Sequence, residues 1–285
     1  MNINIKNINT IYNQIGLSNP NNNFYKGKED KHQQVITYCA QIISIINKLS
    51  SKRDIVMLDC GCGKSYLSFI LYAYCSMVLK RKIKIIGIDT NAYASVIDKC
   101  KDSAEKLGFK NMYFDDVSIT DFQTNSKIDI VYSLHACDTA TDQTIALGIK
   151  HKAKYIFSVS CCQHTSRNKI SGHPLTAVSR YQPYKERLAD MISDSMRALL
   201  LESNDYGVRI FEFTSQKHTP KNIMLRAVRN QVKKKEKDIA SINYNNLTKM
   251  FKFRPVLERL ISDFQENSIR NESLSYDNKI VENCI

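Results

Sequence analysis

The stretch Ile55-Val56-Met57-Leu58-Asp59-Cys60-Gly61-Cys62-Gly63-Lys64-Ser65-Tyr66-Leu67-Ser68 decides the fold of this chain. A short apolar run ends in an acidic residue, two glycines follow with one residue between them, and an apolar helical pattern then begins. This order predicts a strand, a tight turn and a helix. Glycines let the backbone approach a ligand closely, and the N-terminus of the following helix points at the same space. The stretch therefore predicts a site for a nucleotide-like cofactor.

The spacing of the glycines excludes two common phosphate-binding loops. A dinucleotide fingerprint needs a third glycine three residues after the second, and Tyr66 occupies that position. A Walker loop needs four residues between its glycines, so Gly63-Lys64-Ser65 is only a fragment of one. A glycine turn that merely joins a strand to a helix is the structural alternative.

The Asp-Cys-Gly-Cys-Gly segment resembles the Asp-x-Gly-x-Gly signature of class I S-adenosylmethionine-dependent methyltransferases. The resemblance implies that Asp59 and the Gly61-Cys62-Gly63 turn hold the methionine end of that cofactor. A sulfonium ligand with an amine benefits from a nearby carboxylate and has no phosphate to bind.

Acidic residues also follow the next two expected strands. Asp89, followed by Thr90, ends the strand 83–88 and is placed to accept hydrogen bonds from ribose hydroxyls. After the strand 111–114, a carboxylate is placed to accept from the adenine amine while Val117 or Ile119 packs on the ring; Asp115 competes for this role, and we prefer Asp116. The alternatives are a carboxylate at a helix N-terminus for Asp89 and a plain turn for Asp116.

The strands expected at 128–134 and 153–160 are followed by groups that can carry chemistry. His135 and Asp138 come after the first of them, at the sheet edge where ligands sit in open α/β sheets. We predict His135 as a general base oriented by Asp138; a histidine that caps a helix or satisfies the core is the alternative. Cys161 or Cys162 is a candidate for covalent attack on a pyrimidine, although packing of two small side chains at a strand end is the favoured interpretation.

A metal site is a further alternative. Six possible ligands follow strands at one sheet edge: Cys60, Cys62, Cys137, Cys161, Cys162 and His164. Paired Cys-x-x-Cys spacing is absent, so the sequence predicts no metal site.

Further segments are similar to one branch of methyltransferase-like proteins, over about residues 24–229. This branch carries Leu-His-x-Cys after strand four and Cys-Cys after strand five, matched here by Leu134-His135-Ala136-Cys137 and Cys161-Cys162. Lys31-His32-Gln33-Gln34 is similar to a Lys-Lys-x-His-Glu stretch of that branch, and Gly172-His173-Pro174-Leu175 resembles one of its loops. The resemblance implies a Rossmann-like α/β fold with a seven-stranded, mostly parallel sheet, a reversed last strand and helices on both faces. It also implies that S-adenosylmethionine is the methyl donor and that Lys31, Leu134 and His135 lie near it. The methyl acceptor is then a group in RNA or protein. An Asn/Asp-Pro-Pro-Tyr segment is lacking, which argues against an exocyclic amine held by such a motif.

Composition and charge favour RNA as the substrate. The chain has 285 residues, 43% hydrophobic and 24% charged, and a net charge of +13, which attracts polyanions. A long loop with the run Arg180-Tyr181-Gln182-Pro183-Tyr184-Lys185 is expected to be a lid that faces the substrate. The alternatives are a protein methyltransferase and a catalytically silent RNA-binding module.

Three regions are expected: a flexible arm (1–23), a methyltransferase domain (24–229) and a basic helical C-terminal extension (230–285) with a disordered tail. We expect neither a signal peptide nor a membrane span. Nine cysteines, several in apolar patterns, indicate reduced thiols and a cytoplasmic protein.

Overall fold

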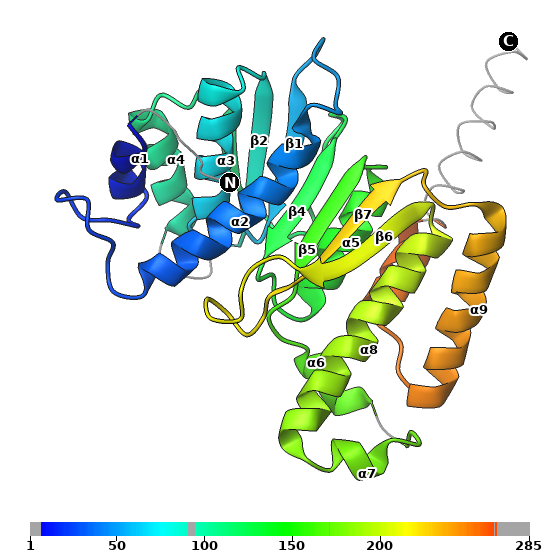
Figure 1. Ribbon diagram of the computed structural model, residues 1–285. Helices are drawn as coiled ribbons and strands as arrows, with labels where there is room; N and C mark the ends of the chain where they lie inside the picture. Colours follow the sequence, from blue (N-terminus) through cyan, green and yellow to red (C-terminus); the bar gives the residue numbers. More distant parts are fainter. Residues whose placement is uncertain (1–6, 91–94, 171, 265, 267–285) are drawn as a thin grey trace, which may run out of the picture.

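A single seven-stranded sheet forms the centre of the computed structural model (Figure 1), which describes residues 7–90, 95–170, 172–264 and 266. The strand order is β3-β2-β1-β4-β5-β7-β6. The strands are β1 (Ile55–Cys60), β2 (Ile83–Asp89), β3 (Met112–Asp116), β4 (Ile130–Leu134), β5 (Tyr155–Val159), β6 (Tyr206–Glu212) and β7 (Ile223–Arg229).

All the pairs among β1 to β5 are parallel, and β7 runs antiparallel to both of its neighbours. The carboxyl ends of β1 to β5 therefore meet at one edge of the sheet. Cys60 pairs with Ile88, and Asp89 pairs with Asp116. The expected mostly parallel, Rossmann-like sheet with a reversed last strand is confirmed.

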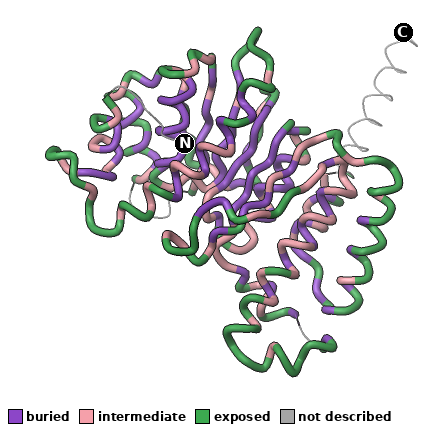
Figure 2. Tube along the Cα trace, viewed as in Figure 1, coloured by how far each residue is buried: buried purple, intermediate pink, exposed green. Residues whose placement is uncertain are grey.

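Helices cover both faces of the sheet and bury two separate apolar layers (Figure 2). Side chains alternate between the faces along a strand, so Met57 joins one layer and its neighbour Leu58 the other. The first layer includes residues of α1 (Ile8–Gln14), α2 (Lys28–Ile46), α3 (Tyr66–Ala73), its π-helical continuation η1 (Tyr74–Val78) and α4 (Val96–Lys106). The second includes residues of α5 (Thr139–Lys150), α8 (Gln182–Ser203) and α9 (Lys234–Phe251).

The N-terminal segment differs from the flexible arm expected for residues 1–23. From residue 7 onward the segment is described, and α1 places Ile11 in the first apolar layer together with the fully buried Leu17. The hydroxyl of Tyr12 is hydrogen-bonded to Nε2 of His32 on α2, at 2.7 Å. The sequence did not predict this docking because the few apolar residues of the segment fall in one helix of 7 residues. A hydrophobic pattern of that length cannot be told from the pattern of a coil.

Two other regions contain more structure than the sequence indicated. The long loop expected as a lid contains α6 (His164–Lys169) and α7 (Thr176–Ser179), and Figure 1 shows α7 beside the start of α8. In the extension, Tyr244 and Phe251 of α9 and Leu257 beyond it are buried in the second apolar layer. The tail expected to be disordered lies outside the described residues, apart from residue 266. No helix within the described ranges combines the length and the apolar character needed to span a bilayer.

Candidate active site

The glycine turn after β1 is fastened to the end of β2. The amide groups of Gly61 and Cys62 both donate to the carbonyl of Ile88, at 2.9 and 3.1 Å. The amide of Gly63 donates to Oδ2 of Asp89 at 2.7 Å. Gly61 and Gly63 have φ angles of 68° and 50°, in the left-handed region that glycine adopts without strain. The turn therefore presents bare main chain at the carboxyl edge of the sheet.

Asp59 is a buried carboxylate directly before this turn. It is 3% exposed, and its Oδ2 accepts hydrogen bonds from Ser68 at 2.5 Å and from Ser65 at 3.3 Å. Burial raises the pKa of Asp59 to about 7; the two serine hydroxyls oppose this shift, the charge of Asp89 adds to it, and Lys31 opposes it. Asp59 is thus close to half ionised at neutral pH and responds to a positive charge brought beside it.

A cavity of about 200 Å³ lies between the glycine turn and α2. Lys31 of α2 is half-buried in its wall, and burial, then Lys28, lower the pKa of its ammonium group while Asp59 raises it. Six of the residues predicted to bind the cofactor line this cavity: Lys31, Asp59, Gly61, Cys62, Gly63 and Leu134. Tyr66 and Lys64 line it as well.

The other predicted cofactor residues lie at the ends of β2, β3 and β4. Asp89 is half-buried, and besides Gly63 it accepts from the amide of Thr90 at 2.8 Å. Val117 donates its amide to the carbonyl of Asp89 at 3.0 Å, which brings the exposed Asp116 to the same edge. Within the described part of the chain, each Asp89 oxygen receives one of these hydrogen bonds, and a carboxylate oxygen has a second lone pair that can accept from a further donor.

His135 lies at the end of β4 with its partner on α2. Its Nε2 is 2.9 Å from Oε1 of Gln34, whose amide nitrogen donates to the carbonyl of His218 at 2.7 Å. Because Gln34 offers an oxygen, Nε2 of His135 is the donor, and Nδ1 is a buried acceptor without a partner among the described residues. Burial, then the charge of Lys31, lower the pKa of His135 to about 4. A group with that pKa binds a proton weakly, so the structure argues against the predicted general base.

Asp138 is not the residue that orients His135. Its carboxylate accepts from the hydroxyl of Thr165 at 2.6 Å and from the amide of Thr165 at 3.1 Å, at the start of α6. His135 and Asp138 share an unusual backbone, with φ angles of 67° and 51°. Non-glycine residues in this region store strain, and such strain concentrates at functional sites.

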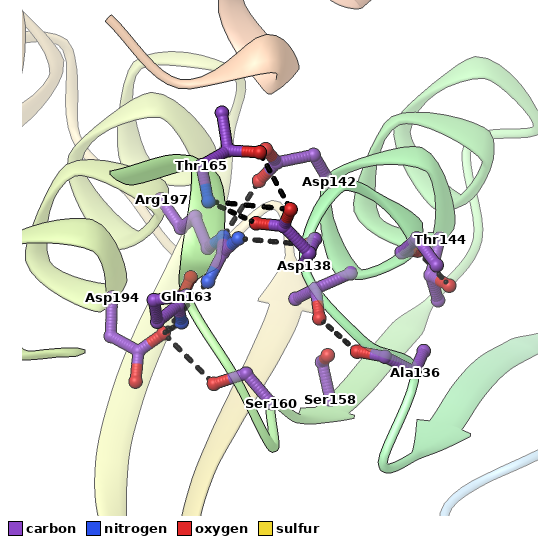
Figure 3. Close-up of polar contacts among 12 residues, drawn as sticks. Ala136, Asp138, Asp142, Thr144, Ser158, Ser160, Gln163, Thr165, Asp194 and Arg197 are labelled. Carbon is purple, nitrogen blue, oxygen red and sulfur yellow. Dashed lines mark hydrogen bonds and ion pairs between the residues drawn. The ribbon is translucent and has the colours of Figure 1, made fainter. Parts of the chain in front are cut away.

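A buried charge network holds the loops that follow β4 and β5 (Figure 3). Arg197 of α8 donates to Asp142 at 2.6 Å, to Asp194 at 3.1 Å and to the carbonyl of Asp138 at 3.3 Å. Oδ1 of Asp194 also accepts from Ser160 and Gln163, both at 3.3 Å. The side chains of Arg197 and Asp142 are 2% and 5% exposed. The network therefore fixes the two loops relative to each other.

The cysteines predicted at the site lie beside a third one. The sulfurs of Cys137, Cys161 and Cys162 are all within 4.8 Å of one another. Burial, then Cys137, raise the pKa of both Cys161 and Cys162, so these groups are thiols at neutral pH. Because the thiolate is the nucleophilic form, this environment argues against the candidate covalent attack and agrees with the favoured interpretation of two small side chains packed at a strand end.

Comparison with known proteins agrees with this geometry. Residues 30–169 match a family model described as a methyltransferase domain. The matched residues carry the glycine turn, Asp59, Asp89 and the ends of β1 to β5. The protein is an S-adenosylmethionine-dependent methyltransferase, and residues 30–169 carry its methyltransferase domain. No curated protein sequence matches the chain.

Several solved structures resemble this methyltransferase at low sequence identity. Magnesium protoporphyrin IX methyltransferase from Synechocystis PCC 6803, with bound S-adenosylhomocysteine, is 16% identical over 77% of this chain and 93% of its own, with a TM-score of 0.47. An rRNA methylase from Streptococcus thermophilus is 9% identical over 71% of this chain and 97% of its own, with a TM-score of 0.43.

The residues at the carboxyl edge fit S-adenosylmethionine. The cavity combines unhindered main chain at Gly61 and Gly63 with a buried carboxylate at Asp59, which suits the charged methionine end of the cofactor. Asp89 retains acceptor capacity one strand further along the edge. The cofactor supplies an electrophilic methyl group at this edge when it is bound.

Sequence reasoning missed the residues that support this site. Gln34 and Arg197 bind partners that are 101 and 55 positions away in the chain, and Ser68 binds Asp59, which is 9 positions away. Gln34 belongs to the Lys31-His32-Gln33-Gln34 segment of the resemblance and Ser68 ends the stretch 55–68, and these places were the available signal. Arg197 lies in an ordinary amphipathic helix, and nothing in the sequence marked it as part of the site.

Replacing Asp89 by alanine is expected to weaken S-adenosylmethionine binding by about 10- to 100-fold. A hydrogen bond to a charged group contributes about 1.5–3 kcal/mol, and the variant also releases the amide of Gly63. Isothermal titration calorimetry measures the change. Asp102→Ala is the control, because Asp102 is exposed and its ion pair among the described residues is with Lys106 on the outer side of α4. An Asp89→Ala affinity within twofold of the wild type would contradict this assignment.

Proposed function

We propose that this methyltransferase modifies RNA. The observation that carries the proposal is an exposed basic and aromatic surface at the start of α8, beside a hollow that reaches the loop after β5. The surface consists of Arg180, Tyr181, Tyr184 and Lys185, and we call it the α8 surface. Its tyrosines are 55% and 52% exposed, although large aromatic side chains usually bury much of their area.

The α8 surface has the two features that bind single-stranded RNA. The rings of Tyr181 and Tyr184 are 6.1 Å apart, and the guanidinium group of Arg180 lies 5.3 Å from the Tyr181 ring centre. Exposed aromatic rings stack on unpaired bases, and arginine and lysine contact phosphates. Lysines and arginines elsewhere bring the net charge to +13, which favours a polyanion over a typical protein substrate.

A hollow of about 140 Å³ lies between α8 and the loop after β5. It is lined by Cys161, Cys162, Arg167, Glu186 and Lys221, among others. Glu186 directly follows Lys185 of the α8 surface and pairs with Arg167 at 3.1 Å. We infer that a base unstacked on the α8 surface enters this hollow.

Catalysis in this site rests on alignment. Methyl transfer is an in-line displacement, and holding the reacting atoms in line contributes about 7–11 kcal/mol. The strained backbone after β4, fixed by Arg197 and Thr165, supplies a rigid wall for this purpose. Burial and the charge of Lys31 keep the imidazole of His135 neutral, and Gln34 accepts a hydrogen bond from its Nε2, which leaves Nδ1 available as a hydrogen-bond acceptor.

Labelled cofactor tests the substrate class directly. The purified protein is incubated with S-[methyl-³H]adenosylmethionine and either total RNA or total protein, and we expect label in the RNA. Label confined to protein would overturn the RNA proposal and support a protein methyltransferase. Absence of label from both, while calorimetry shows cofactor binding, would also count against RNA as substrate.

Removing both tyrosines of the α8 surface is expected to weaken the binding of single-stranded RNA by at least about tenfold. Stacking contributes about 1–3 kcal/mol per base, and the Tyr181→Ala/Tyr184→Ala variant removes two stacking rings. Fluorescence anisotropy with labelled RNA measures the effect at fixed salt. Tyr113→Ala is the matched control, because Tyr113 is 45% exposed on β3, at the opposite end of the sheet order. Equal losses in both variants would contradict a specific role for the α8 surface.

A further inference from the structure

Three thiols from two neighbouring loops meet at the carboxyl edge of the sheet. Cys137 follows β4 by three residues, and Cys161 and Cys162 follow β5 by two and three residues. Because Leu134 pairs with Val159 in the parallel β4–β5 ladder, both loops leave the sheet at the same level. The three sulfurs lie within 4.8 Å of one another, and those of Cys137 and Cys161 both approach the carbonyl of His135, at 3.6 and 3.5 Å.

We propose that Cys137, Cys161 and Cys162 form a three-thiolate site for a thiophilic divalent metal ion, with zinc as the physiological occupant. Zinc binds thiolates at about 2.3 Å in tetrahedral geometry, which places neighbouring sulfurs about 3.8 Å apart. Sulfurs within 4.8 Å of one another reach that spacing through shifts of about 1 Å or less. The proposal concerns metal binding alone and does not depend on RNA being the substrate.

The surroundings of the three sulfurs suit a negatively charged metal cluster. Metal binding releases the three thiol protons to solvent, and three thiolates with one divalent ion then carry one net negative charge. Lys31 interacts electrostatically with Cys161 and offsets this charge. Arg167 and Lys221, which line the hollow beside Cys161 and Cys162, are paired with Glu186 and Asp190 at 3.1 and 2.5 Å. The Arg197 network fixes both loops through Asp138 and Ser160, so that the three sulfurs are held close together before metal binds.

The donor set leaves one coordination position open. Three protein ligands with one open position is the arrangement of zinc sites that bind a water molecule or a substrate atom, whereas structural zinc sites have four protein ligands. An ion held by Cys161 and Cys162 lies at the wall of the 140 Å³ hollow. The open position is therefore within reach of a small donor that enters the hollow.

Cobalt serves as the spectroscopic probe, because thiolate-bound Co²⁺ absorbs strongly in the near ultraviolet. The full-length protein is purified with its thiols reduced and titrated with Co²⁺ and then with Zn²⁺. We expect one Co²⁺ per chain, with the charge-transfer absorption of thiolate ligands, and loss of that absorption when Zn²⁺ displaces it. Binding of less than one tenth of an equivalent, or absorption without thiolate charge transfer, would overturn the proposal.

Ligand variants locate the site. Cys137→Ser is the first, because Cys137 is exposed and its replacement leaves the core unchanged. Changing a residue that hydrogen-bonds to a metal ligand weakens metal binding by about 10- to 100-fold. Loss of one of the three thiolates is expected to weaken Co²⁺ binding by more than that. Cys161→Ser and Cys162→Ser are expected to do the same. Cys75→Ala is the control, because Cys75 is a buried cysteine of η1. Unchanged Co²⁺ binding in Cys137→Ser, with circular dichroism like that of the wild type, would overturn the site.

Discussion

Replacing Arg197 by methionine is expected to lower the free energy of unfolding by about 3–5 kcal/mol, the usual loss when one partner of a buried ion pair is removed. The variant leaves Asp142 and Asp194 without the guanidinium group that binds both, and the side chain of Asp142 is 5% exposed. Methionine retains much of the apolar stem, so most of the loss is electrostatic. Urea unfolding monitored by circular dichroism measures it.

Two further variants separate the charge network from ordinary packing. Lys106→Ala breaks a pair whose side chains are 59% and 54% exposed and is expected to cost at most about 1 kcal/mol. The triple variant Arg197→Met/Asp142→Asn/Asp194→Asn removes all three charges and is expected to recover part of the stability lost in Arg197→Met, since no unpaired charge remains buried. If the triple variant is less stable than Arg197→Met, repulsion between uncompensated carboxylates is not the cause of the loss.

Local patterns in the sequence were sufficient for the sheet and the glycine turn. Asp59, Gly61 and Gly63 lie within five consecutive positions, and strand, turn and helix each leave a signal at that range. The position of Asp89 could be predicted for the same reason, because a strand that ends in a carboxylate has a fixed place in a parallel sheet. The six cavity-lining residues predicted from the sequence come from this turn, its neighbouring strand end at Leu134 and α2.

The sequence did not reveal which residues that are distant in the chain pair with each other. His135 was assigned Asp138 as its partner because the two are close in the chain, yet Gln34 of α2 holds it. Nothing in the sequence states how α2 crosses the ends of the strands, and one residue of helical register changes which side chain faces His135. The three cysteines met the same obstacle, because their proximity follows from the register of β4 against β5.

Replacing Asp59 by asparagine is expected to stabilise the folded chain at alkaline pH. Burial raises the pKa of Asp59 to about 7, whereas the pKa of an aspartate in an unfolded chain is about 3.9. Between these values the folded state binds more protons, so the stability of the wild type falls as pH rises from about 4 to 7. The shift corresponds to about 4 kcal/mol at 1.36 kcal/mol per unit, and asparagine, which does not ionise, avoids this cost.

The free energies of unfolding of the Asp59→Asn variant and the wild type are therefore compared at two pH values. At pH 8 the Asp59→Asn variant is expected to exceed the wild type by about 2–4 kcal/mol in urea unfolding, and at pH 4.5 the two are expected to be nearly equal. Asp102→Asn is the control, because Asp102 lies on the surface and its side chain is 54% exposed. A difference between Asp59→Asn and the wild type that does not change with pH would show that Asp59 ionises in the folded chain as easily as in the unfolded one.

The same ionisation couples pH to cofactor binding. S-adenosylmethionine carries positive charge at its amine and sulfonium groups, and that charge favours the ionised form of Asp59. Below pH 7 the wild type must release a proton from Asp59 on binding, so its affinity is expected to rise by up to about tenfold per pH unit and to level off above pH 7. The Asp59→Asn variant is expected to bind more weakly, with no dependence on pH in this range. Calorimetry between pH 5.5 and 8 tests both statements. Equal slopes in the two proteins would show that the stability lost by burying Asp59 serves no purpose in cofactor binding.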